Sequence, residues 1–321
     1  MIKWQYKIGN DRGERKNEKQ VIERERYMRL YAPCYYKHFK CIADRCEHSC
    51  CIGWEIDIDK DTLKKYKGMK DGYGAAIADS ISMKGSPHFV LDECERCPHL
   101  DEQGLCRIIK NVGEDHLCDI CREHPRFYNY TDVCEVGIGM SCPEAARIIL
   151  ASAEYATLED LGTVDAVADE IGFDARALRA EVYAILCDAS QSYKDRLSAI
   201  YRRFSLDVGE DEGWLGILDS LEYLHPEHKA LFMKYSAQSR PEGADEYLER
   251  ALAYFVYRHC TEALDEGDFA ARLAFCLFCE RLLASLILSE QAKDLQGVAA
   301  LARVLSEEIE YSDDNTFSLM Y

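Results

Sequence analysis

Cysteine is the residue type in this sequence whose number and spacing most clearly point to chemistry. The chain of 321 residues contains 16 cysteines, and twelve of them fall between positions 34 and 142. The densest group, Cys41-x4-Cys46-x3-Cys50-Cys51, places four thiols within eleven residues. Thiolates in such groups select zinc or iron–sulfur clusters, whereas isolated free cysteines more often pack as small buried side chains. The spacing therefore predicts a metal site, with zinc and an iron–sulfur cluster both open.

A second group of cysteines has the spacing of paired metal ligands. Cys94-x2-Cys97 and Cys118-x2-Cys121 are separated by twenty residues, at the edge of the spacing typical of zinc sites with four cysteine ligands. Three more cysteines lie between or after these pairs, at positions 106, 134 and 142. Because one tetrahedral zinc ion needs only four ligands, a single zinc site leaves several thiols without a role.

The rest of the sequence favours a reducing compartment over a secreted, disulfide-stabilised protein. Residues 1–27 are charged throughout and contain no apolar stretch that could act as a signal peptide. The longest apolar tract, Ala270–Leu288, is interrupted by three charged side chains, so we expect no membrane-spanning helix. We therefore expect a cytoplasmic protein that does not act on membranes.

The elements that must position the cysteines can be read from the change in pattern along the chain. Residues 1–27 are predicted to be a charged flexible extension. Residues 28–144 form a predicted small Cys-rich, metal-binding domain with short strands, such as 53–59 and 135–140. Residues 145–321 show helical periodicity and are predicted to form an acidic α-helical bundle domain. The predicted fold class is therefore mainly α.

Helix-start signals mark the beginning of the helical half and several helices within it. Ser141 is a predicted N-cap, with Pro143 in the first turn and Glu144 at the capping-box position. Pro226 and Pro241 are predicted to open later helices. The four cysteines of this half lie in apolar helical patterns and are expected to pack in the core; they are Cys187, Cys260, Cys276 and Cys279.

The charge distribution limits the partners of the protein. The formal net charge is −19, and residues 151–321 carry 33 acidic side chains against 15 basic ones. A surface of this sign repels the phosphate backbone of nucleic acids. We therefore expect no nucleic-acid partner.

Four separated motifs of the first half resemble the flagellin lysine-N-methylase family, which lies within a broader group of zinc- or iron-chelating cysteine-cluster proteins. The motifs occur in the order of the family and cover about residues 28–150. A weaker likeness is found in SEEIEYSDDN, at 306–315. The four motifs are CIADRCEHSCCIGWEIDID from Cys41, CPHLDEQGLCRI (97–108), LCDICREHPRF (117–127) and SCPEAARIIL (141–150).

The resemblance implies an enzyme that holds a [4Fe-4S] cluster and transfers methyl groups from S-adenosylmethionine to lysine side chains of flagellin. The family pattern leaves Cys94 and Cys134 outside and does not decide Cys118. Two alternatives stay open: an electron-transfer or metal-chelating protein without methylase activity, and a structural zinc module. The implied metal ligands are Cys41, Cys46, Cys50, Cys51, Cys97, Cys106, Cys121 and Cys142, more than the four that one cluster needs.

Residues beside the cysteines are candidates for the remaining chemistry. Methylation needs a neutral amine, and Asp57 and Asp59, on one face of the predicted strand, are candidate acceptors of its proton. Arg126 lies in a matching motif and could bind a carboxylate of the donor with two hydrogen bonds. Trp54 could shield a cluster or stack on the adenine of the donor. The structural alternatives are a solvated strand face, a helix cap and core packing.

Overall fold

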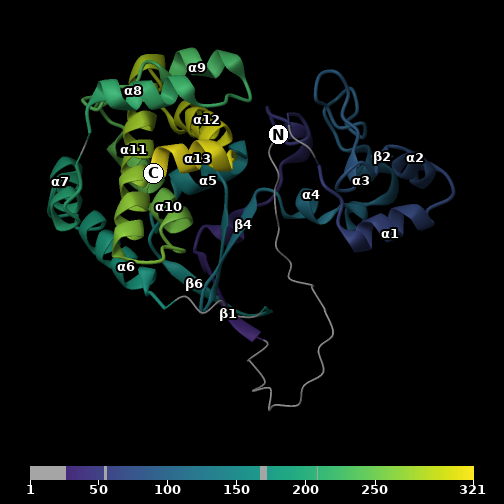
Figure 1. The fold of residues 1–321 in the computed structure, drawn as a ribbon, viewed down its shortest axis with the longest axis horizontal. Helices are drawn as coiled ribbons and strands as arrows, with labels where there is room; N and C mark the ends of the chain where they lie inside the picture. The colour runs from purple at the N-terminus through teal and green to yellow at the C-terminus, as the bar shows by residue number, and fades with distance from the viewer. Residues whose placement is uncertain (1–26, 54–55, 167–171, 208) are drawn as a thin grey trace.

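The computed structural model describes residues 27–53, 56–166, 172–207 and 209–321. Figure 1 shows a large helical part and a smaller lobe beside it, with β4 running between them. We call residues 43–124 the cysteine lobe and the remaining described residues the main body. Helices dominate the molecule, and the prediction of a mainly α fold with a Cys-rich region of short strands is confirmed.

A four-stranded sheet in the main body holds both ends of the cysteine lobe. Its order is β4-β5-β1-β6, with β1 parallel to β5 and the other two pairs antiparallel. The lobe is inserted in the chain between β1 and β4. The strands span Tyr27–Pro33 (β1), Arg126–Tyr130 (β4), Cys134–Ile138 (β5) and Leu158–Asp165 (β6).

The sheet corrects part of the sequence-based expectation. The predicted strand at 135–140 is confirmed as β5, whereas β6 lies within the segment that was expected to be helical throughout. The side chains of β6 are half-buried or exposed, and its sequence lacks the alternation of apolar residues that predicts a strand. Strands from both sides of residue 144 therefore pair with each other, and the division into domains at that residue stays a prediction.

The cysteine lobe is built from short elements around a small core. Apolar side chains such as Ile56, Tyr66 and Phe89 pack there with the cysteines themselves. So small a core supplies little burial energy, and bound metal commonly supplies the rest in domains of this size. The elements are η2 Ala43–Arg45, α1 Lys60–Gly68, α2 Tyr73–Asp79, β2 Ile81–Ser82, β3 His88–Phe89, α3 Arg107–Val112, η3 Glu114–His116 and α4 Asp119–Glu123; η1, Tyr36–His38, precedes the lobe.

The predicted strand at 53–59 does not form within its described part. Residues 56–59 are bridged once, at Asp57 and His88, and the chain then enters α1. Asp59 ends the extended stretch because it is the N-cap of α1: its carboxylate accepts the backbone N–H of Thr62. Trp54 lies outside the described residues.

The start of the helical half follows the predicted signals only in part. Helix α5, Pro143–Ala151, begins with Pro143 as expected. Its N-cap is Cys142, however, and not Ser141, and Glu144 pairs with Arg147 and forms no capping box. Placing the cap one residue later brings a thiol, and not a hydroxyl, to the first turn of this helix.

The remaining helices surround one long buried helix. Pro226 opens α9 as predicted, whereas Pro241 lies four residues before the first residue of α10. The elements are α6 Ala175–Leu186, α7 Tyr193–Arg203, α8 Asp211–Ser220, α9 Pro226–Phe232, α10 Asp245–His259, α11 Glu266–Glu290, α12 Leu295–Leu305, the π-helical turn η4 Ser306–Glu310, and α13 Asp313–Met320.

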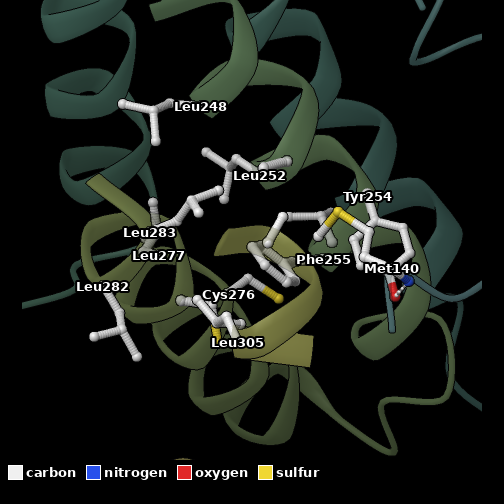
Figure 2. Packing of buried hydrophobic residues seen from close by; sticks show 14 of the residues in the cluster. Met140, Leu248, Leu252, Tyr254, Phe255, Cys276, Leu277, Leu282, Leu283 and Leu305 are labelled. Atoms are coloured by element: carbon white, nitrogen blue, oxygen red, sulfur yellow. Dashed lines mark hydrogen bonds between the residues drawn. The ribbon is translucent and has the colours of Figure 1, made fainter. Parts of the chain in front are cut away.

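Helix α11 is the centre of the main body. It is buried around most of its circumference, as expected for a helix that is apolar on all sides. Figure 2 shows its Cys276 and neighbouring leucines among apolar side chains of α10, with Met140 nearby. The apolar tract of the sequence thus forms a core helix, and in the described part of the chain no helix is long and apolar enough to cross a membrane.

Glu280 on α11 gives the core a dependence on pH. Burial raises the pKa of Glu280 to about 7, although Arg240, the hydroxyl of Tyr193 and Arg281 act in the opposite direction. When the pKa of a carboxyl is higher in the folded than in the unfolded state, the folded protein loses stability as the pH rises from the unfolded-state pKa toward 7. We expect Glu280→Gln to raise the free energy of unfolding by roughly 3 kcal/mol at pH 8 and much less at pH 5.

Thermal unfolding at the two pH values tests this expectation. Glu266→Gln is the matched control, because Glu266 is exposed at the start of the same helix. Equal stability of Glu280→Gln and the unchanged protein at pH 8 would contradict the predicted sign.

Candidate metal centre and its junction with the main body

Six thiols from four segments of the cysteine lobe are gathered in one place. Cys51 and Cys97 are joined through the backbone, where Cys97 N–H donates to Cys51 O at 2.9 Å. Cys106 and Cys118 stand at the starts of α3 and α4, and Cys121 lies within α4. The charges of Cys50, Cys97 and Cys106 act on the thiol of Cys51, and those of Cys118, Cys51 and Cys97 act on the thiol of Cys121. We call these residues the thiol group: Cys50, Cys51, Cys97, Cys106, Cys118 and Cys121.

Two pairs within the thiol group share a hydrogen bond. The side chains of Cys50 and Cys51 are hydrogen-bonded to each other, which lowers the pKa of Cys50 to about 7 and raises the pKa of Cys51. Cys118 and Cys121 behave in the same way, with the pKa of Cys118 lowered and that of Cys121 raised. Each pair thus favours one thiolate that accepts the S–H of its neighbour. Thiolates are the form in which cysteine binds metal.

Backbone N–H groups further stabilise sulfur as an anion. Cys106 and Cys118 precede short helices, where free N–H groups face the cap side chain. Burial raises the pKa of Cys106, while the N–H groups of Ile109 and Ile108 act against that rise. In iron–sulfur sites such hydrogen bonds to sulfur tune the cluster.

The other predicted ligands lie at the edge of this group, toward the main body. The charges of Cys46 and Cys142 interact with each other and with that of Cys50, and exposed Cys41 interacts with Cys46. The structure thus connects all eight predicted ligand cysteines in one array and adds Cys118. Whether they bind metal stays a prediction.

The remaining cysteines lie apart from the array. Cys94 is exposed and Cys134 is buried in β5. Cys276 and Cys279 are fully buried in the core, as predicted. Cys187 is exposed at the end of α6, so its expected burial is wrong; its position directly after the last helical turn places it outside the apolar face.

The junction between lobe and main body requires close approach of the chains. Gly53 has a φ of +89°, and a Cβ there would lie 3.2 Å from Leu224 Cδ2. Within the main body, a Cβ on Gly139 would lie 2.8 Å from Arg258 Nη1 and 2.6 Å from the hydroxyl oxygen of Tyr311, whose ring lies near His124 of the lobe. Both glycines therefore allow contacts that a larger residue would block.

A polar network from the C-terminal turn η4 lies at this junction. Glu307 Oε1 is 3.0 Å from Nε2 of His48, a residue of the first cysteine motif. The ring of Tyr311 packs on Arg258, 5.1 Å from the ring centroid, and lies near His124. Burial lowers the pKa of His124 to about 4, and the nearby His48 acts in the same direction. The structure thus brings the weak motif at 306–315 against two of the cysteine motifs.

The predicted residues other than cysteine have structural partners. Asp59 caps α1 and also accepts the backbone N–H of Asp119 at 2.9 Å, which ties α1 to α4. Asp57 is half-buried at its bridge to His88. Arg126 Nε donates to the Tyr36 hydroxyl at 3.0 Å, and its guanidinium lies over the rings of Tyr36 and Phe39. A role for these residues in catalysis stays a prediction.

Sequence reasoning missed the junction residues His124, Glu307 and Tyr311 as site candidates. In the sequence, the acidic residues at 307, 308 and 310 look like the solvated face of a surface helix. Glu308 and Glu310 are nevertheless buried. The signals available were the weak likeness of 306–315 to the family and the place of His124 within the motif at 117–127.

Comparison with known proteins bears on this arrangement. The chain is 35% identical to flagellar biosynthetic protein FliU of Salmonella muenchen over 126 residues, which are 37% of this chain and 75% of that protein. Proteins named lysine-N-methylase from Salmonella choleraesuis and Salmonella typhimurium are 33% and 32% identical over the same length. The chain belongs to this FliU and lysine-N-methylase family. The family resemblance of the cysteine motifs is thereby confirmed.

The family match covers only part of the longer relatives. The aligned segment is 31% of each of the two lysine-N-methylases, so this chain spans about a third of their length. No model of a known protein family matches the chain, and no solved structure matches it.

Proposed function

We propose that the protein is a protein-lysine N-methyltransferase that acts on flagellin, uses S-adenosylmethionine as methyl donor and depends on a [4Fe-4S] cluster. The observation that carries the proposal is the thiol group, six cysteines in a chain whose relatives include proteins named lysine-N-methylase. The name of the third relative refers to flagellar biosynthesis and supports a flagellar protein as substrate. The site of action proposed is the cytoplasm.

The donor set fits an iron–sulfur cluster. Six thiols exceed the four that a cluster needs, and N–H groups at helix starts are placed to bond sulfur. Among the described residues, no three cysteine sulfurs lie within 4.8 Å of one another, whereas the ligands of a tetrahedral zinc ion at Zn–S 2.3 Å lie about 3.8 Å apart. The described thiols therefore lack the compact spacing of a tetrahedral zinc site.

Thiols of the lobe core are the proposed ligands, in the first place Cys51, Cys97, Cys118 and Cys121, with Cys50 and Cys106 beside them. When bound, a [4Fe-4S] cluster supplies an iron centre for electron transfer or for binding a donor group. The chain itself supplies burial and hydrogen bonds that hold the sulfurs. A lysine substrate must also lose its proton before it attacks the methyl group, and Asp57, Asp59 and Arg126 remain the proposed catalytic candidates.

A second candidate function is an iron–sulfur or zinc protein without methylase activity. It is favoured by the partial match, since this chain spans about a third of the two lysine-N-methylases. In that case the thiol group would serve electron transfer or hold the lobe together.

Anaerobic purification with metal analysis and a methyl-transfer assay separates the two. We expect about four iron and four sulfide per chain, and transfer of labelled methyl from S-adenosylmethionine to purified flagellin. The control is flagellin whose lysines have been chemically blocked. Bound cluster without transfer would support the second function, and zinc without sulfide would overturn the cluster and with it the proposed enzyme.

A further inference from the structure

A second group of metal-ligating side chains lies outside the thiol group, where the cysteine lobe meets the C-terminal helices. A cavity of about 290 Å³ opens there between the first cysteine motif, α9 and α12. Three histidines line it: His48 from the lobe, and His225 and His228 at the start of α9. Imidazole groups from separate parts of the chain are therefore gathered on one cavity.

Two carboxylates of the turn η4 stand beside these histidines. His228, Glu307 and Glu308 each place a ligand atom so that all three atoms lie within 4.8 Å of one another. His228 Nδ1 is 2.6 Å from Glu308 Oε1, and His225 Nε2 is 3.9 Å from Glu307 Oε2. No other group of three such residues in the described part of the chain is as compact.

We propose that His228, Glu307 and Glu308, with His225 as a fourth ligand within reach, bind a divalent transition-metal ion at this cavity. Imidazole and carboxylate together suit Zn²⁺, Fe²⁺ and Mn²⁺. The site is separate from the thiol group and does not depend on the proposed methylase activity.

The hydrogen bonds of the group prepare it for a cation. Glu308 is buried and accepts the backbone N–H of Leu224 at 2.7 Å and of His225 at 3.0 Å, so its carboxylate is fixed. A metal ion bound to both His228 Nδ1 and Glu308 Oε1 would take the place of the hydrogen that these two atoms now share. The ligand side chains are thus held in place before the ion arrives.

The charge balance and the backbone also favour a cation. Arg303 pairs with Glu307 through Oε2, the same oxygen that faces His225, so the Glu308 carboxylate is the one left uncompensated by arginine among the described residues. Glu227 adds a further carboxylate to the cavity wall. Both carboxylates come from a π-helical turn, a rare backbone form that is concentrated at functional sites.

An ion at this position would connect two parts of the molecule. His48 belongs to the loop between Cys46 and Cys50, and its Nε2 contacts Glu307. An ion bound to Glu307 would therefore lie at the contact between the cysteine lobe and the main body and would strengthen it.

Binding of Mn²⁺ to the full chain tests the site, because manganese prefers oxygen and nitrogen ligands and leaves the thiols free. The protein is purified anaerobically, treated with a chelator and titrated with MnCl₂ while the electron paramagnetic resonance signal of free Mn²⁺ is recorded. We expect about one saturable site per chain. Glu307→Gln and His228→Ala are each expected to weaken the affinity by at least about 10-fold.

A histidine elsewhere provides the matched control. His38→Ala removes an exposed imidazole that lines a different cavity, and its affinity for Mn²⁺ should be unchanged. His225→Ala, a less buried change, keeps the test valid if the other variants fold poorly, which circular dichroism reports. Absence of saturable binding, equal affinity of all variants, or equal loss in the control would each overturn the proposal.

Discussion

Replacing Cys121 by serine is expected to abolish the visible absorbance of the proposed iron–sulfur cluster and, with it, the proposed methyl transfer. Cys121 is half-buried in α4 beside Cys118, and the charges of Cys51 and Cys97 act on its thiol, so a hydroxyl in its place removes a sulfur from the thiol group. Serine binds iron far less readily than thiolate does. The measurement is the absorbance spectrum and the iron and sulfide content of anaerobically purified protein.

Cys94→Ser is the matched control for this change. Cys94 is in the same lobe and only three residues before Cys97, but it is exposed and outside the thiol group. Its replacement should leave the cluster intact. The structure also predicts loss of absorbance for Cys118→Ser, which the sequence motifs alone leave undecided. Equal loss in all three variants would contradict a defined ligand set, and full absorbance in Cys121→Ser would remove this residue from it.

Replacing Arg179 by alanine is expected to lower the free energy of unfolding by about 3–5 kcal/mol. Arg179 on α6 donates to both carboxylate oxygens of Glu135 on β5, at 2.7 and 2.6 Å, and to the hydroxyl of Thr261. Both charged side chains are almost fully buried. Removal of the guanidinium leaves the Glu135 carboxylate without its partner in the interior, where an unpaired charge is costly. Chemical or thermal unfolding measures the loss.

An exposed ion pair of the same helix provides the control. Arg203 of α7 pairs with Glu181 of α6, and both side chains are more than two-fifths exposed. Arg203→Ala should change the free energy of unfolding by less than about 1 kcal/mol. A loss at Arg179 no larger than the loss at Arg203 would show that the buried pair does not hold the sheet to the helices.

Much of the candidate site could be predicted from sequence because its ligands cluster along the chain. The spacing of Cys41 to Cys51 and the family motifs identified the array before any fold was known, and helical periodicity identified most of the main body. Cys118 was left undecided because the sequence around a metal-binding cysteine does not differ from the sequence around a buried free cysteine. Only the contact of its side chain with Cys121 places it in the thiol group.

The missed features depend on contacts between distant segments. Strand β6 is mostly exposed and carries no apolar alternation, so only its pairing with β1 defines it. In the sequence Glu307 looks like a surface residue. Its place at the junction follows only from its contact with His48, which belongs to another part of the chain. Such pairings are properties of the tertiary structure, and no local pattern encodes them.

The insertion of the cysteine lobe between β1 and β4 has a consequence for the order of folding. β1 pairs with β5 only after about a hundred intervening residues have been brought into a closed loop, and the entropy of closing a loop rises with its length. A metal that gathers cysteines from four segments of that loop shortens its free length beforehand. If the proposed cluster binds, its loading and the closure of the β1–β5 pair are therefore expected to be linked steps as this chain folds.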